Sequence, residues 1–197
     1  MIKVLNIVAE YDLYRIFLDN NTTLLVDDDD VIKYQILSKK VLTPAANTAL
    51  ALKNNYYQCY CAALKLLGVK MLSTKELAHK LRYKKYETET INQVIAQLVV
   101  RNYLNDDILR DDYIEFKINQ GYGPQYIKNK LYQLGLDSHI TISLEQQKEA
   151  LQNFFLRSSY KINDAKAFQK IATKLCRQGF AYDLIVEVYE EYKGKDD

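Results

Sequence analysis

Lysine and arginine gather in one stretch of this chain. Residues 53–86 carry eight basic residues and one acidic residue, a net charge of +7, whereas residues 87–116 carry a net charge of −5. A basic block followed by an acidic block is typical of a surface that faces a polyanion or a charged protein partner. Phosphate groups are bound by several such cations together, which makes the affinity depend steeply on salt.

Basic residues also recur at comparable places further along the chain. We expect ten of them to contact nucleic acid or a protein partner: Lys75, Lys80, Arg82, Lys84, Lys85, Lys128, Lys130, Lys170, Lys174 and Arg177. An ordinary solvated helix face is the alternative interpretation of the first cluster. Tyr83 and Tyr86 lie beside that cluster, where an aromatic ring can stack on a base. For Tyr86 the repeat pattern favours packing instead.

Acidic residues form a second candidate surface, which we expect to face a charged partner. It consists of Asp106, Asp107, Asp111, Asp112 and Glu115. Carboxylates near a helix N-terminus are favoured by the helix dipole, so helix entry is a simpler interpretation of these aspartates than a magnesium site.

No group of residues has the spacing of a catalytic or metal site. G-Y-G-P at 121–124 lacks the Lys-Ser/Thr of a phosphate-binding loop, and four contiguous aspartates at 27–30 lack the alternation of a calcium loop. Two histidines and three cysteines offer few zinc ligands, and the cysteines suggest no disulfide framework. We therefore expect no enzyme activity, no metal and no cofactor.

Composition favours a helical protein. Only six glycines and two prolines occur in 197 residues, and both residue types interrupt helices. No apolar run approaches the roughly 20 residues that span a bilayer, and the N-terminus becomes acidic too soon for a secretion signal. We expect a cytoplasmic monomer that does not contact a membrane.

The first 44 residues differ from the remainder. L-Y-R-I-F-L-D at 13–19 alternates as a strand does, D-N-N has the residue types of a turn, and T-T-L-L-V at 22–26 predicts a second strand. The first eight residues predict a third strand. The aspartates at 27–30 predict the start of a short helix, because negative charge is favoured there.

A repeated phrase organises the remaining residues. The pair Lys-Leu occurs at 80–81, 130–131 and 174–175, at spacings of 50 and 44 residues, and each pair precedes a large apolar or aromatic residue. Ten residues after the Leu, the first and third copies have isoleucine, whereas the middle copy has Thr141. Each phrase is predicted to end the second helix of a three-helix unit, with the third helix of the middle unit the weakest.

We predict a mostly α-helical fold with three tandem three-helix repeats and a small N-terminal β segment. The β-rich segment spans 1–44 and the repeats span 45–105, 106–145 and 146–197. Stacking of such repeats completes the burial of their apolar faces, and it forms an elongated body that can curve.

Local signals place several helix ends. Ser73 and Glu76 form a capping box, and a further helix begins near Thr88. Asp106 and Asp107 open another helix, and Pro124 fits the first position of the helix after it.

Three stretches resemble the RecX family of bacterial recombination regulators. They read A-L-K-L-L-G-V-K-M-L-S-T-K-E-L-A-H-K-L at 63–81, N-Y-L-N-D-D at 102–107 and G-Y-G-P-Q-Y-I-K-N-K-L-Y-Q-L-G-L at 121–136. The resemblance covers about residues 50 to 192, and the N-terminal strands are similar to a β segment of some members.

The family motifs are matched with two departures. Ser73, Glu76 and Leu77 match a Ser-x-x-Glu-Leu opening, and residues 123–131 match a Gly-Pro-x-x-Ile-x-x-x-Leu helix. At the Gly-Tyr-Leu-Asp-Asp junction, Asn102 and Asn105 stand where the family has Gly and Asp.

The resemblance implies a non-enzymatic modulator that binds the RecA recombinase and its filament on single-stranded DNA. It implies suppression of strand exchange, of ATP turnover and of the co-protease activity that triggers the SOS response. The basic residues would face DNA or an acidic surface of RecA, and the acidic patch would face basic loops of RecA. Two alternatives stay open: a stand-alone helix-turn-helix-like module that binds nucleic acid, duplex DNA included, and a general helical-repeat scaffold for protein partners.

Overall fold

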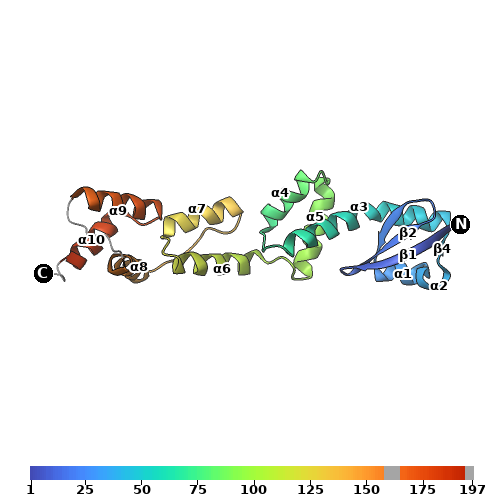
Figure 1. The fold of residues 1–197 in the computed structure, drawn as a ribbon, viewed down its shortest axis with the longest axis horizontal. Helices are drawn as coiled ribbons and strands as arrows, with labels where there is room; N and C mark the ends of the chain where they lie inside the picture. Colours follow the sequence, from blue (N-terminus) through green and yellow to red (C-terminus); the bar gives the residue numbers. More distant parts are fainter. Residues whose placement is uncertain (158–164, 194–197) are drawn as a thin grey trace. The chain divides into compact units, whose positions relative to one another are not determined.

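The computed structural model describes residues 1–157 and 165–193 (Figure 1). The chain divides into two compact units, Met1–Leu104 and Asn105–Asp197. The predicted fold class is confirmed in its main features, since the chain is mostly helical and its strands lie in the first 42 residues of the described chain.

The first unit begins with a four-stranded antiparallel sheet in the order β3-β2-β1-β4. Its elements are β1 (Ile2–Glu10), β2 (Leu13–Leu18), β3 (Thr23–Val26), α1 (Asp28–Lys33), α2 (Ile36–Lys39) and β4 (Val41–Leu42). The three predicted strands and the short helix are therefore confirmed. The sequence did not predict β4, because two residues are too few to show an alternation.

The aspartate run starts α1, as predicted. Asp27 is the N-cap, and its Oδ1 accepts a hydrogen bond from Asp30 N–H at 2.7 Å. Asp30 itself is buried, with 2% of its surface exposed, and its carboxylate accepts from Lys53 Nζ at 2.8 Å. Tyr57 Oη donates to Asp27 at 2.6 Å. This network ties the start of α1 to the long helix that follows the sheet.

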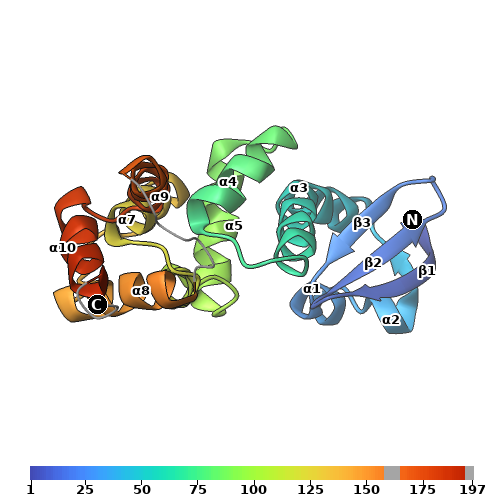
Figure 2. The same cartoon turned by 60° about the vertical axis from the view of Figure 1, so that its left-hand side comes forward.

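Three helices complete the first unit. They are α3 (Pro44–Leu67), α4 (Thr74–Tyr83) and α5 (Thr88–Val100), and Figure 2 shows α3 beside the sheet. The predicted capping box starts α4, with Ser73 and Glu76 each accepting a hydrogen bond from the other's backbone N–H. The first half of α3 packs on the sheet, and its second half shares a core with α4 and α5.

The second unit contains two small cores. Its helices are α6 (Asp106–Asn119), α7 (Pro124–Leu134), α8 (Leu144–Arg157), α9 (Ala165–Arg177) and α10 (Tyr182–Lys193). Residues of α6, α7 and the segment after α7 form one core, and α8, α9 and α10 form the other.

The middle repeat departs from the predicted three helices. Residues 135–143 hold no helix, and α8 belongs to the core of the third repeat. Ile140 and Ile142 pack against Ile127, Leu131 and Leu136 in place of a third helix. In an extended chain every second side chain lies on the same side. Ile140 and Ile142 can therefore both reach this core although the segment is not helical.

The repeated Lys-Leu phrase ends the second helix of each repeat with the same turn. The residue with left-handed backbone is Lys85 (φ 66°), Gly135 (φ 77°) or Gly179 (φ 97°). The next residue donates its N–H to the carbonyl of the phrase's Leu: Tyr86 to Leu81 (3.3 Å), Leu136 to Leu131 (2.9 Å) and Phe180 to Leu175 (3.2 Å). This is the Schellman pattern, which satisfies carbonyls at the helix end and turns an apolar residue onto the last turn. The packing role expected for Tyr86 is thereby confirmed.

Two glycines join the middle and third repeats through their backbones. Gly123 N–H donates to the Gln178 carbonyl at 2.7 Å, and Gln125 N–H donates to the Gly179 carbonyl at 3.2 Å. A Cβ on Gly179 would lie 2.3 Å from the Tyr126 nitrogen, and one on Gly123 would lie 2.5 Å from the Gly179 oxygen. Only glycine allows this approach, which fixes α7 relative to α9.

Gly179→Ala should destabilise the second unit, because the new Cβ meets the Tyr126 backbone and the backbone is left-handed. We expect a loss of about 2–4 kcal/mol in the free energy of unfolding, measured by urea denaturation followed by circular dichroism. Gly121→Ala is the control: Gly121 has a similar φ of 79° but open space around it, so we expect about 1 kcal/mol. Equal losses would show that the close approach contributes nothing.

Tyr57→Phe should destabilise the first unit by about 1–3 kcal/mol at pH 7, because a donor to a carboxylate is lost. Burial raises the pKa of Asp27, but hydrogen bonds from Tyr57 and Asp30 bring that pKa below its usual range. A carboxyl group whose pKa is lower in the folded than in the unfolded chain stabilises the fold at pH values above its unfolded pKa. This stabilisation is lost as the pH falls through its folded pKa.

The difference between Tyr57→Phe and wild type should therefore shrink below about pH 4, as measured by urea unfolding across pH. Tyr56→Phe serves as the control, because the Tyr56 hydroxyl makes no hydrogen bond with another described residue. A pH-independent loss in Tyr57→Phe would contradict the role assigned to its hydroxyl.

Candidate nucleic-acid and protein interface

Five of the predicted cations lie on α4 and in the turn that ends it. Lys75, Lys80 and Arg82 lie on the helix, Lys84 and Lys85 lie in the turn, and all five are exposed. The sequence cluster is thus a cluster on one helix and its C-terminal turn.

The helical cations of α4 divide between two flanks. At about 100° per residue, Lys80 lies on one side of the buried stripe, and Lys75 and Arg82 lie on the other side. That stripe is formed by Leu77 and Leu81, which are fully buried.

The other five predicted cations lie on the second helices of the middle and third repeats. Lys128 and Lys130 are on α7, and Lys170, Lys174 and Arg177 are on α9. In both views α7 and α9 lie on the same side of the second unit, with α8 on the other (Figures 1 and 2). The Lys of each Lys-Leu pair takes the same position beside the buried Leu, so these three lysines share one flank of their helices.

Most of these cations have no ionic partner. Nine make no ion pair with another described residue: Lys80, Arg82, Lys84, Lys85, Lys128, Lys130, Lys170, Lys174 and Arg177. Lys130 donates to Gln133 at 3.0 Å, and Lys174 lies 5.1 Å from the centre of the Phe154 ring. A cation in the last turn of a helix is also favoured by the dipole, so exposure alone does not assign a binding role.

Lys85 is the exception among the candidate cations. Its φ of 66° places a long side chain in the left-handed region, where the middle and third repeats use glycine. A residue with a Cβ is disfavoured there by about 1–2 kcal/mol. The conformation of the backbone therefore does not favour a lysine at this position, and Tyr11, Gln35 and Lys40 are further residues of the described chain that carry a long or bulky side chain at positive φ.

The acidic patch starts α6, but its aspartates are not the cap. Asn105 is the N-cap, and its Oδ1 accepts from Asp107 N–H at 3.1 Å and from Ile108 N–H at 3.0 Å. Asp106 and Asp107 occupy the first turn, where the dipole favours negative charge. The predicted start of α6 at Asp106 is confirmed, and the N-cap is the residue before it, Asn105.

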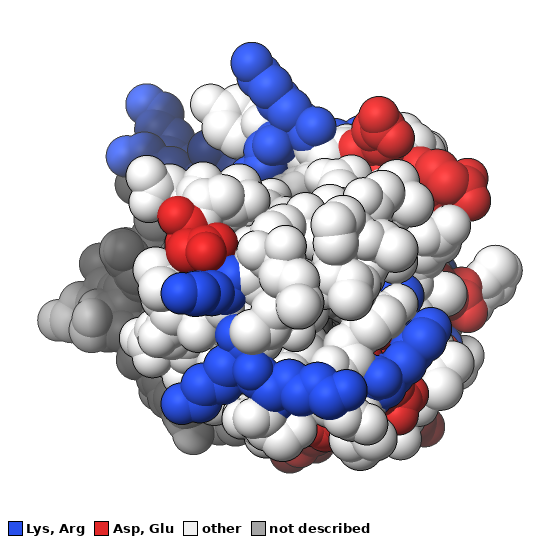
Figure 3. Space-filling model, turned by 90° about the vertical axis from the view of Figure 1, so that its right-hand side faces the viewer, with Lys and Arg blue, Asp and Glu red and all other residues white. Residues whose placement is uncertain are grey.

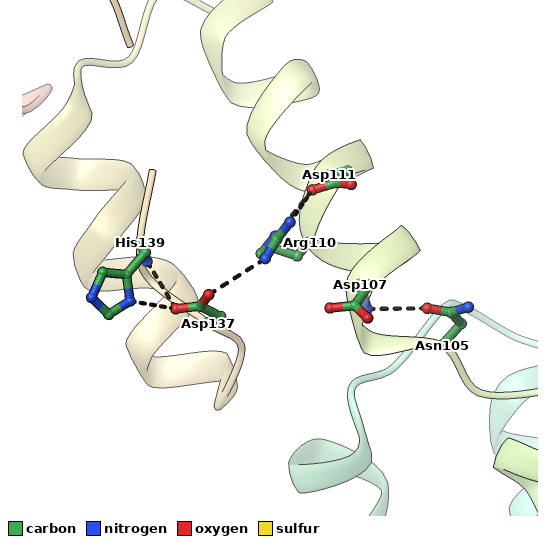
Figure 4. Close-up of polar contacts among 6 residues, drawn as sticks. All are labelled: Asn105, Asp107, Arg110, Asp111, Asp137 and His139. Carbon is green, nitrogen blue, oxygen red and sulfur yellow. Dashed lines mark hydrogen bonds and ion pairs between the residues drawn. The ribbon is translucent and has the colours of Figure 1, made fainter. Parts of the chain in front are cut away.

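An arginine partly neutralises the acidic patch (Figure 4). Arg110 pairs with Asp111 at 2.8 Å and with Asp137 at 3.5 Å. Hydrogen bonds from the His139 backbone and ring hold the pKa of Asp137 below its usual range. Asp111 thus shares a surface ion pair with Arg110, and Asp111, Asp112 and Glu115 are all exposed.

Exposed cations also occur outside the repeats. Lys3, Lys33, Lys39 and Lys40 in the N-terminal segment are exposed. Figure 3 shows a row of Lys and Arg side chains along the lower edge of the face seen from that end, and further ones at its upper left. These residues are spread over strands and short helices, so no run in the sequence marked them.

Known proteins resemble this chain over most of its length. A family model for the first three-helix domain of RecX matches residues 59–98. Regulatory protein RecX of Streptococcus pyogenes serotype M5 (strain Manfredo) is 30% identical over 193 residues, 92% of this chain and 74% of its own. Regulatory protein RecX of Legionella pneumophila (strain Corby) is 30% identical over 143 residues, 69% of this chain and 95% of its own.

This chain belongs to the RecX family. Two crystal structures agree with its fold. A regulatory protein RecX has a TM-score of 0.66 at 18% identity and covers 96% of this chain and 100% of its own. RecX from Lactobacillus salivarius has a TM-score of 0.56 at 26% identity and covers 70% of this chain and 96% of its own.

Both departures from the RecX junction motif keep the backbone roles of the residues they replace. Asn102 has a φ of 58°, and asparagine tolerates the left-handed conformation better than most residues that carry a Cβ. Asn105 caps α6 as well as aspartate does. The junction of this RecX chain is therefore structurally intact.

None of the helices in the described residues of this RecX chain is both long and apolar enough to cross a membrane. Cys59 and Cys61 are buried thiols, and Cys176 is exposed.

Lys85→Gly should raise the free energy of unfolding of the first unit by about 0.5–1 kcal/mol, since relief of backbone strain exceeds the added chain entropy. Asn102→Gly is the matched control, because asparagine already tolerates this conformation and the change should be near zero. Urea denaturation measures both. A loss of stability in Lys85→Gly would refute the assignment of strain to this position.

Proposed function

We propose that this chain binds RecA and its filament on single-stranded DNA and inhibits recombinase, ATPase and co-protease activity, thereby modulating DNA repair and the SOS response. Membership of the RecX family carries this proposal, because the resemblance in sequence implies RecA as the partner. The chain acts in this proposal as a binding protein and not as an enzyme.

The cations at equivalent positions give the proposal a physical basis. Lys80, Lys130 and Lys174 are each held beside a buried Leu of the same repeat phrase. A charge repeated at fixed positions suits a partner that is itself repetitive, such as a nucleoprotein filament with its phosphates at regular intervals. Arg82, Lys84 and Lys85 add positive charge near Lys80 in the first unit, with Lys85 supplied at a cost in backbone strain.

The acidic patch has the opposite role in this proposal. Asp106, Asp107, Asp112 and Glu115 leave negative charge on α6 after Asp111 has paired with Arg110. Such a patch steers association with a basic protein surface and disfavours contact with phosphates. We therefore assign it to RecA and assign the cations to DNA or to acidic surface of RecA.

The test is a titration of RecA ATP hydrolysis on single-stranded DNA. We expect the triple variant Lys80→Ala/Lys130→Ala/Lys174→Ala to need about tenfold more protein for half-inhibition. The logarithmic salt dependence of binding should fall by about 2, at roughly 0.7 per lost contact to a single strand. The triple variant Lys3→Ala/Lys39→Ala/Lys193→Ala removes the same net charge elsewhere and should inhibit nearly as wild type.

Unchanged ATP turnover across a wide titration of the wild-type chain would overturn the proposal. Tight, salt-sensitive binding of duplex DNA in a gel shift without RecA, and without inhibition of turnover, would support the stand-alone nucleic-acid module instead. An equal loss in the two triple variants would show that net charge, and not position, governs binding.

A further inference from the structure

A pocket of about 390 Å³ lies in the first unit, between the sheet and the second half of α3. Its apolar walls include Leu25 from β3 and Ala62 and Leu66 from α3. Arg15, Lys65 and Lys84 supply its charged lining. The volume lies within the roughly 300–1,000 Å³ that is typical of sites for small organic ligands.

One carboxylate holds two of the three cations in place. Glu10 accepts from Arg15 Nε at 2.6 Å through one oxygen and from Lys65 Nζ at 3.0 Å through the other. Lys84 makes no ion pair with any residue of the described chain. Three cations against one carboxylate leave an excess of about two positive charges. This excess is enough to balance the negative charge of one phosphate monoester at neutral pH.

The remaining polar groups of the pocket add no negative charge. Burial raises the pKa of the Cys61 thiol to about 11, so this group is neutral at pH 7. Tyr86 donates its hydroxyl proton to the Gln58 carbonyl at 3.3 Å, and burial also raises the pKa of Tyr86. The ligand that fits this lining is therefore an anion with an apolar part.

We propose that this pocket binds one nucleotide, with its base against Leu25, Ala62 and Leu66 and its phosphate among Arg15, Lys65 and Lys84. Its link to DNA rests on the proposed function, which it deepens by assigning a nucleotide site to the β-rich segment and α3. Two ligands offer this combination of base and phosphate: a nucleotide within a single strand and a free mononucleotide. Single-stranded nucleic acid is commonly bound by cations that contact its phosphates beside side chains that contact its bases, and Tyr86 adds an aromatic ring to this lining.

Isothermal titration calorimetry of the full chain without RecA tests the proposal. The probes are thymidine monophosphate, a short oligothymidylate and inorganic phosphate. Lys84→Ala removes the unpaired cation, and Ala62→Met fills the pocket without a change of charge. Lys39→Ala is the control, because Lys39 is exposed and does not line the pocket. Circular dichroism confirms that each variant folds.

We expect Lys84→Ala and Ala62→Met each to weaken nucleotide binding by about tenfold, and Lys39→Ala to leave it unchanged. Binding of both nucleotide probes identifies a free mononucleotide as a ligand, and binding of the oligomer alone identifies a strand. Inorganic phosphate that binds as tightly as the nucleotides, equal affinity in all variants, or no binding by wild type would each overturn the proposal. Because RecA is absent, failure here is distinct from failure to inhibit RecA.

Discussion

In each repeat of this RecX chain, the second helix ends in the same kind of turn, which contains one residue with left-handed backbone conformation. That residue lets the next N–H reach back to the Leu of the Lys-Leu phrase, and it directs Tyr86, Leu136 or Phe180 into a core. The phrase repeats because every part of it has a place in this turn: the Leu is buried, the Lys beside it is excluded from the core, and the apolar residue covers the end. Packing of the Leu thereby places the backbone of the cation, and contacts with Gln133 and Phe154 add to the placement of Lys130 and Lys174.

The turn also determines how neighbouring repeats join. In the second unit, Gly179 is the left-handed residue of the turn that ends α9. Its backbone also lies so close to Gly123, at the start of α7, that neither residue has room for a Cβ. In the first unit the corresponding residue is Lys85, and α3 instead links the repeat to the sheet through two cores and the Asp30–Lys53 pair. The same turn thus joins two repeats where its left-handed residue is glycine. It carries an exposed cation where that residue is Lys85.

Signals carried by neighbouring residues made most helix ends predictable. The capping box at Ser73, the aspartates at the start of α1 and Pro124 at the start of α7 each act within one turn, so the sequence shows them directly. The pairing of Asp30 with Lys53 and the nucleotide-sized pocket involve residues far apart in the sequence, and no local pattern reveals them. The middle repeat was mispredicted because two isoleucines flanking Thr141 suit an extended chain as well as a weak helix.

At four of the ten candidate cations, the helix dipole favours the charge independently of any partner. Lys80, Arg82, Lys174 and Arg177 lie in last turns, where a helix dipole favours them whether or not a partner binds. At Lys85 the two considerations separate, since the backbone favours glycine and the chain has lysine. At this one position the charge is present against the preference of the backbone, so the contribution of Lys85 to binding and its effect on the stability of the turn can be measured separately.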